Sequence, residues 1–106
     1  MRASMAVTGL AICPQVSLAE GFTGKDFSAW PVESQDSFIQ TSVTMAGVVL
    51  TQLQPEKSTC IDKWYIGEGR RAERDAYIRE TIIAYSNFHP SGTLLAILVE
   101  ACGSLK

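Results

Sequence analysis

The stretch SGTLLAILVEAC, residues 91–102, decides the fold of this chain. As a helix it would be apolar on every side except at Glu100, and such a helix is typical of the buried centre of a domain. Ser91 stands where an N-cap is expected, and Gly103 stands where a glycine often ends a helix. We therefore predict a central, buried helix that closes at Cys102.

Residues 70–88 predict an amphipathic helix in front of it. They begin with the charged run RRAERD, and Ile78, Ile82 and Tyr85 then fall on one stripe. The pair His89-Pro90 would break this helix, because the residue before a proline avoids helical backbone angles. His89 is the one histidine of the chain, and its position predicts a structural role near the negative end of the helix dipole.

Residues 58–66 predict a short helix, because four aromatic, aliphatic or sulfur-bearing side chains recur there at helical spacing. The side chains that would share one side of this helix are those of Cys60, Ile61, Trp64 and Tyr65. Gly67 and Gly69 would end it.

Residues 37–53 carry apolar side chains at alternating steps of four and three from Ile39 to Leu53, which is the pattern of one helical face. The alternation of β-branched and polar residues between Ile39 and Met45 would suit a strand instead, but the length of the pattern favours a helix. Pro55 would stop it.

Residues 20–36 are polar and rich in turn-forming residues, and they predict an irregular N-terminal segment. Phe22, Phe27 and Trp30 are its candidate core residues, and Ser34 or Ser37 is the candidate cap of the next helix. The domain as a whole, residues 37–106, is predicted to be all-α, a small bundle of about four helices.

Residues 1–19 differ in composition from the rest of the chain. They hold one charged residue, Arg2, followed by an apolar run and by the small residues Ser17 and Ala19. This order is typical of a signal peptide cleaved after Ala19, and it predicts a periplasmic or secreted protein. The run is shorter than the roughly 20 residues that span a bilayer. The alternatives are a buried N-terminal element of a cytosolic protein and a lipoprotein leader ending at Cys13.

Removal of this leader would leave 87 residues with two of the three cysteines, Cys60 and Cys102. In a small exported domain two cysteines most simply form a disulfide, which would join the short helix to the end of the last helix. Two free buried thiols in a reducing compartment are the alternative. The remaining 8 basic and 11 acidic side chains make the domain mildly acidic, which disfavours a nucleic-acid partner.

The order of motifs in the C-terminal half resembles the Rap1a/Tai family of bacterial periplasmic immunity proteins. Thr59-Cys60-Ile61 precedes a helix, His89-Pro90 follows that helix, and the last apolar helix closes on Ala101-Cys102. The likeness is strongest over residues 59–103, whereas the first helix lacks the cysteine that the family usually has there. The resemblance implies an HdeA-like, disulfide-linked helical fold and a role in blocking a cell-wall-degrading toxin. An HdeA-like acid-stress chaperone and an envelope protein of another role are the alternatives.

The chain offers few parts for catalysis. No His, Cys and carboxylate residues stand at metal-ligand spacing, and no nucleophile and base can be paired. The run GEGRR, residues 67–71, shares only its glycines with a phosphate-binding loop. We therefore expect a non-enzymatic binding protein without cofactor or metal.

A binding protein needs a contact surface, and the charged stretch from Trp64 onward is the candidate, because Trp, Tyr and Arg are over-represented at binding hot spots. An unpaired buried carboxylate is costly, so Glu100 is expected at the rim of the domain, paired with a Lys or Arg. The alternatives are a titratable switch and a partner contact. The candidate partner contacts are Trp64, Tyr65, Glu68, Arg70, Arg71 and Arg74.

Overall fold

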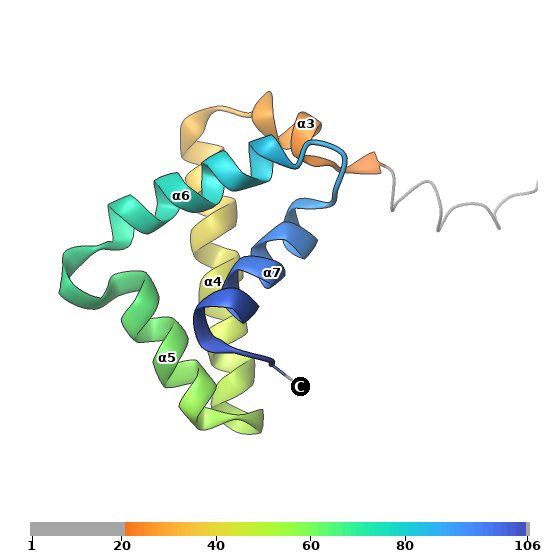
Figure 1. Ribbon diagram of the computed structural model, residues 1–106. Coiled ribbons are helices and arrows are strands. Elements are labelled where there is room, and N and C mark those ends of the chain that lie inside the picture. Colours follow the sequence, from red (N-terminus) through yellow and green to blue (C-terminus); the bar gives the residue numbers. More distant parts are fainter. Residues whose placement is uncertain (1–20, 106) are drawn as a thin grey trace, which may run out of the picture.

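The computed structural model describes residues 21–105, so the expected leader, residues 1–19, lies outside the described residues. Five α-helices and one 3-10 turn make up the described range, and no strand occurs in it (Figure 1). They are α3 (Gly24–Ser28), α4 (Val32–Leu53), α5 (Pro55–Ile66), η2 (Gly67–Gly69), α6 (Arg71–Ala84) and α7 (Pro90–Cys102). The all-α class is confirmed, and the strand alternative for residues 37–53 is wrong.

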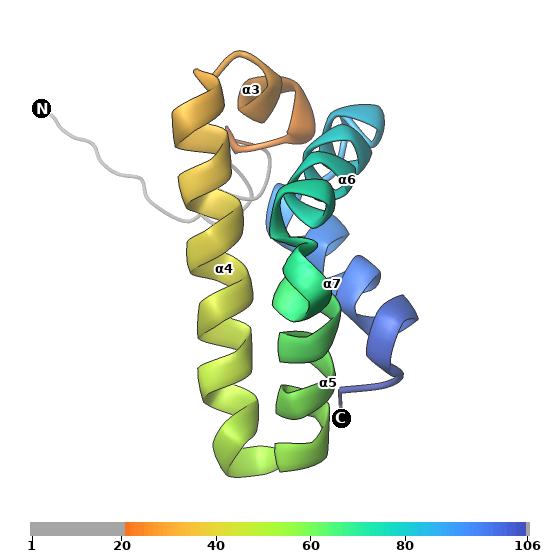
Figure 2. The ribbon, with the colours of Figure 1, turned by 90° about the vertical axis from the view of Figure 1, so that its left-hand side faces the viewer.

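Helices α4 and α5 lie side by side as a hairpin (Figure 2). Gln54 alone separates them, and Pro55 occupies the first turn of α5, where a missing N–H costs no hydrogen bond. Pro55 thus ends one helix and begins the next, so α5 starts three residues before the predicted boundary at residue 58.

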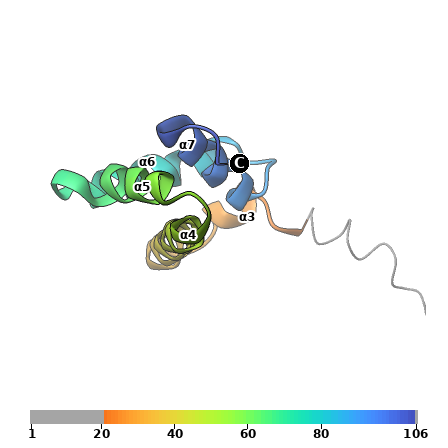
Figure 3. The same cartoon turned by 90° about the horizontal axis from the view of Figure 1, so that it is seen from below.

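Helices α5, α6 and α7 lie on one side of α4 when the molecule is viewed from below (Figure 3). The buried side chains between them form one core, drawn from every helix of the described range. These residues are Phe27, Ile39, Val43, Leu50, Ile61, Tyr65, Ile78, Ile82, Leu94, Ile97 and Leu98. Within residues 21–105 no helix combines the length and the hydropathy needed to cross a bilayer.

Helix α7 is less buried than its sequence predicts. Leu94, Ile97 and Leu98 pack into the core, but Leu95 is 52% exposed and Val99 is 37% exposed. The reason is geometric: α7 packs against the bundle with one face and has no described helix on the other. A helix that is apolar all round therefore forms an outer wall here instead of a centre.

His89, and not Ser91, caps α7. The backbone N–H of Ser91 donates to His89 Nδ1 at 3.1 Å, and Pro90 fills the first turn. At the other end Gly103 terminates the helix as predicted, with a φ of 88° that favours glycine.

The N-terminal segment is helical where it was expected to be irregular. Thr23 and Asp26 form a capping box that starts α3, and Phe27 on that helix is fully buried. Helix α4 begins at Val32, directly after Pro31, so the predicted caps Ser34 and Ser37 lie inside it.

Helix α3 docks on the turn between α6 and α7. Gly24 N donates to Phe88 O at 2.9 Å, and Lys25 N donates to Ser86 O at 3.0 Å. Both carbonyls belong to the turn after α6, which ends at Ala84 and not at the predicted residue 88.

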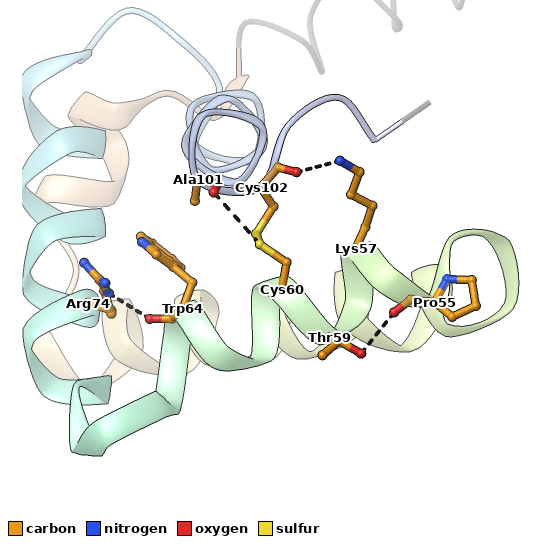
Figure 4. The surroundings of a disulfide bond; sticks show 8 residues. All are labelled: Pro55, Lys57, Thr59, Cys60, Trp64, Arg74, Ala101 and Cys102. Atoms are coloured by element: carbon orange, nitrogen blue, oxygen red, sulfur yellow. Dashed lines mark hydrogen bonds between the residues drawn. A yellow bond between two sulfur atoms is a disulfide. The ribbon is translucent and has the colours of Figure 1, made fainter.

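The disulfide between Cys60 and Cys102 is confirmed, and the alternative of two free thiols is wrong. It joins α5 to the last turn of α7 (Figure 4). Lys57 Nζ donates to the carbonyl oxygen of Cys102 at 2.7 Å, which adds a second tie at the same place.

Candidate functional site

The six candidate contacts do not form one surface. Tyr65 is buried, and its hydroxyl donates to Asp75 Oδ1 at 2.5 Å. Gln40 Nε2 donates to the other oxygen of Asp75 at 3.3 Å, and Arg71 Nε lies 4.0 Å from it. These contacts tie α4, α5 and α6 together. Tyr65 is thereby withdrawn from the surface, whereas the Arg71 side chain is 51% exposed.

The surroundings of Tyr65 favour its protonated form. Burial raises the pKa of the Tyr65 hydroxyl far above its usual value, and its hydrogen bond to the Asp75 carboxylate raises the pKa further. The nearby Arg71 guanidinium lowers that pKa in part. The hydroxyl thus remains a hydrogen-bond donor at neutral pH and satisfies a carboxylate that is 6% exposed.

Glu68 and Arg70 lie on the turn between α5 and α6. Their side chains are exposed and form an ion pair at 3.4 Å, a kind of contact that contributes little to stability. Neither residue lines any of the three grooves described below.

Trp64 and Arg74 do line a groove. The Arg74 guanidinium stacks over the Trp64 ring at 4.6 Å, and Arg74 Nε donates to the Trp64 carbonyl oxygen at 2.8 Å (Figure 4). Both contacts fix the two side chains at one end of a shallow hollow of about 230 Å³, which Tyr77 and Glu100 also line.

This hollow continues into a groove of about 660 Å³ between α6 and α7, because Tyr77, Ile97 and Glu100 line both. We call the joined surface the aromatic groove. Its walls are aromatic side chains from α6 and the following turn, with small residues from α7 between them. Its residues are Trp64, Arg74, Tyr77, Thr81, Tyr85, Phe88, His89, Gly92, Thr93, Ala96, Ile97, Glu100 and Ala101.

Three of the aromatic rings in this groove are open to solvent. Tyr77 is 44% exposed, Tyr85 is 55% exposed and Phe88 is 61% exposed. Tyr85 was predicted to lie on the core stripe, and that prediction is wrong, because the stripe leaves the core after Ile82. The sequence signal that could have indicated this surface is the recurrence of aromatic residues at Tyr77, Tyr85 and Phe88. Tyr85 is the C-cap residue of α6 and lies outside the helix, so helical periodicity does not place it.

Glu100 lies at the junction of the two hollows. It is exposed, and none of the ion pairs within residues 21–105 includes it. The predicted pairing with a Lys or Arg at the rim is therefore absent from the described part of the chain, and Glu100 faces the groove with its charge unneutralised.

A second groove, of about 740 Å³, lies between α4 and α5. Valine, methionine, threonine and serine side chains line most of it, with Asp62 and Arg71 as its charged members. It lacks the clustered exposed aromatic rings that set the aromatic groove apart.

Metal-ligating side chains and histidines are few in residues 21–105. No group of three His, Cys, Asp or Glu side chains in residues 21–105 could hold a metal ion. His89 Nδ1 accepts the Ser91 N–H, and the His89 ring meets the Phe22 ring edge-on at 5.2 Å. The imidazole thus has the structural role predicted for it, although as a cap of α7 and not as the end of α6.

No protein-family model, no curated protein and no solved structure matches this chain. The resemblance to the Rap1a/Tai immunity proteins therefore stays a prediction from the sequence.

Proposed function

We propose that this protein is an exported, non-enzymatic binding protein that occludes a partner protein through the aromatic groove. The observation that carries the proposal is the exposure of Tyr77, Tyr85 and Phe88 on one concave surface. Exposed apolar surface of this kind often marks a binding site. Trp64 and Arg74 extend it with two residue types that dominate binding energy in protein interfaces.

The disulfide supports the exported location. Disulfides persist in oxidising compartments and are rare where thiols are kept reduced. The bond between Cys60 and Cys102 therefore fits a periplasmic or secreted protein, in agreement with the leader-like composition of residues 1–19.

The resemblance to the Rap1a/Tai family suggests the class of partner, a cell-wall-degrading toxin. A bound inhibitor needs no catalytic group, because it acts by covering the active site of its partner. The excess of 11 acidic over 8 basic side chains after removal of the leader favours encounter with a basic partner.

The test uses the products of the genes that neighbour the gene of this protein. Each product is mixed with the disulfide-bonded chain, and complex formation is measured by calorimetry and size-exclusion chromatography with light scattering. We expect a tight complex of fixed stoichiometry with one of them. If none of these products binds, the proposal fails.

A groove-filling variant shows whether the aromatic groove is the contact. A Cβ atom at Gly92 meets no heavy atom within 4 Å, so Gly92→Leu adds a side chain to the groove without a backbone clash. Ser91→Leu is the matched control, because Ser91 is exposed beside it and does not line the groove. We expect Gly92→Leu to weaken the complex at least tenfold and Ser91→Leu to leave it unchanged; equal affinities would exclude the groove.

The alternative, an acid-stress chaperone, predicts a different outcome for the same purified protein. It would suppress aggregation of an unfolded client at about pH 3 and not at neutral pH, because carboxylates protonate between these values. It would also form no complex of fixed stoichiometry with a single partner.

A further inference from the structure

The larger part of the aromatic groove carries charge of one sign. Among the residues that line the part between α6 and α7, Glu100 is the one carboxylate, and no Lys or Arg belongs to that set. Arg74 enters only at the far end, where Trp64 holds its guanidinium by stacking and by a hydrogen bond. Glu100 lines this end as well, yet no ion pair within residues 21–105 joins it to Arg74, so its charge is available beside the apolar surface.

The aromatic rings reinforce this preference. The face of a Tyr or Phe ring carries partial negative charge and attracts a cation that approaches it. Tyr77 lines both hollows together with Glu100, and the rings of Tyr85 and Phe88 meet edge-to-face at 6.0 Å further along. A carboxylate with exposed aromatic rings next to it is the arrangement that recognises an ammonium or a guanidinium group.

The dimensions of the groove suit a stretch of polypeptide. It follows α7 from His89 to Glu100, and eleven helical residues rise about 16 Å. That length matches about five residues of extended chain or three turns of helix. Gly92 and Ala96 have small side chains along the α7 side of the groove, and this leaves room for side chains of a bound segment.

We propose that the aromatic groove receives a segment of the partner protein that presents a lysine or arginine between apolar residues. The cation lies against Glu100 and Tyr77, and the apolar neighbours lie on Tyr85 and Phe88. This inference rests on the proposed function, because it specifies what the partner places in the same groove.

The test uses three short peptides as probes. They are capped pentapeptides of the sequence Phe-Ala-X-Ala-Leu with arginine, glutamine or glutamate as X, titrated into the isotope-labelled, disulfide-bonded chain and followed by amide chemical shifts. We expect shifts on α6 and α7 along the groove, with the arginine peptide binding about fivefold more tightly than the glutamine peptide and the glutamate peptide binding most weakly. Higher salt should reduce the difference.

Glu100→Gln and Glu80→Gln separate the local contact from the overall charge. Both variants lose one negative charge, and Glu80 is exposed on α6 outside the groove. Glu100→Gln should abolish the preference for arginine over glutamine and leave the affinity for the glutamine peptide unchanged, whereas Glu80→Gln should preserve the preference.

Equal affinities of the three peptides for the wild-type chain overturn the inference, as do shifts confined to another face or no shifts at all. This failure is distinct from failure of the proposed function. A tight complex with a neighbouring gene product that Gly92→Leu disrupts would keep the groove as a docking site even if the peptides show no preference for a cation.

Discussion

Replacing Gly24 by alanine should detach α3 from the rest of the domain. An added Cβ atom at this position would lie 2.3 Å from Ile82 O, 2.9 Å from Tyr85 O and 3.0 Å from Ser86 Cα. All three are backbone atoms at the end of α6, so no side chain can rotate away to relieve the clash. An ordinary contact would require α3 to move by about 1 Å.

The loss of stability from that movement can be worked out from the contacts that α3 makes. It would break or lengthen the hydrogen bonds from Gly24 N to Phe88 O and from Lys25 N to Ser86 O, each of which contributes about 1 kcal/mol. It would also disturb the packing of Phe27, which is fully buried, at a cost of about 1 kcal/mol or more. We expect Gly24→Ala to lower the free energy of unfolding by about 3 kcal/mol, and the melting temperature of so small a domain by about 15 °C.

Urea unfolding followed by circular dichroism measures the loss, and tryptophan fluorescence locates it. Trp30 stacks on Phe22 at 5.0 Å and contacts Phe27 at 5.5 Å, so its emission should report release of α3. Gly21→Ala is the matched control, because a Cβ atom there meets nothing within 4 Å; its effect should stay within about 0.5 kcal/mol. A loss below about 1 kcal/mol for Gly24→Ala, or equal losses for both variants, would refute the reasoning.

Three further changes test other parts of the structure. Replacing Cys60 and Cys102 by serine should cost about 4 kcal/mol, because the disulfide closes a loop with a sequence separation of 42; denaturant unfolding would contradict this if the loss were under about 1 kcal/mol. Tyr65→Phe should cost about 1–3 kcal/mol at neutral pH by depriving buried Asp75 of its closest donor. Because burial raises the pKa of Tyr65 in the folded state, the hydroxyl stabilises the fold below about pH 10 and loses this contribution as pH rises further. The stability gap between wild type and Tyr65→Phe should therefore shrink in alkali, and a constant gap in pH-dependent urea midpoints would argue against this linkage. Gly92→Ala should raise the free energy of unfolding by about 0.5 kcal/mol, since an added Cβ atom meets open space and alanine favours a helix. A lower melting temperature would show that the space beside Gly92 is not open.

The long helices were predictable because periodicity reports burial directly. Ile39, Val43 and Leu50 recur at helical spacing and are all buried, so the stripe identified most of α4. It missed the first turn, because α4 begins at Val32, and its last member, Leu53, is 70% exposed. Helix α3 was not predictable in this way, because five residues are too few to establish a period. Its one local signal is the Thr23–Asp26 capping box, whose helix persists only because Phe27 packs into the core.

The candidate site was harder to predict, because hydropathy does not distinguish a core side chain from a groove wall. Tyr85 was predicted on the core stripe and Tyr65 at a partner contact, yet Tyr65 is buried and Tyr85 is 55% exposed. The difference is the carboxylate of Asp75, ten residues after Tyr65, which gives the buried hydroxyl an acceptor. Whether a tyrosine finds such an acceptor depends on how two helices cross, and no local pattern contains that information.

The position of the disulfide bears on binding as well as on stability. The wall that α7 contributes to the aromatic groove is fixed at both ends: His89 caps its first turn and contacts the Phe22 ring, and the Cys60–Cys102 bond holds its last turn with the help of Lys57. A wall held in this way loses little conformational freedom when a partner docks, which lowers the cost of association. The disulfide and the His89 cap thus add to the burial of Leu94, Ile97 and Leu98, which holds the inner face of α7 in the core.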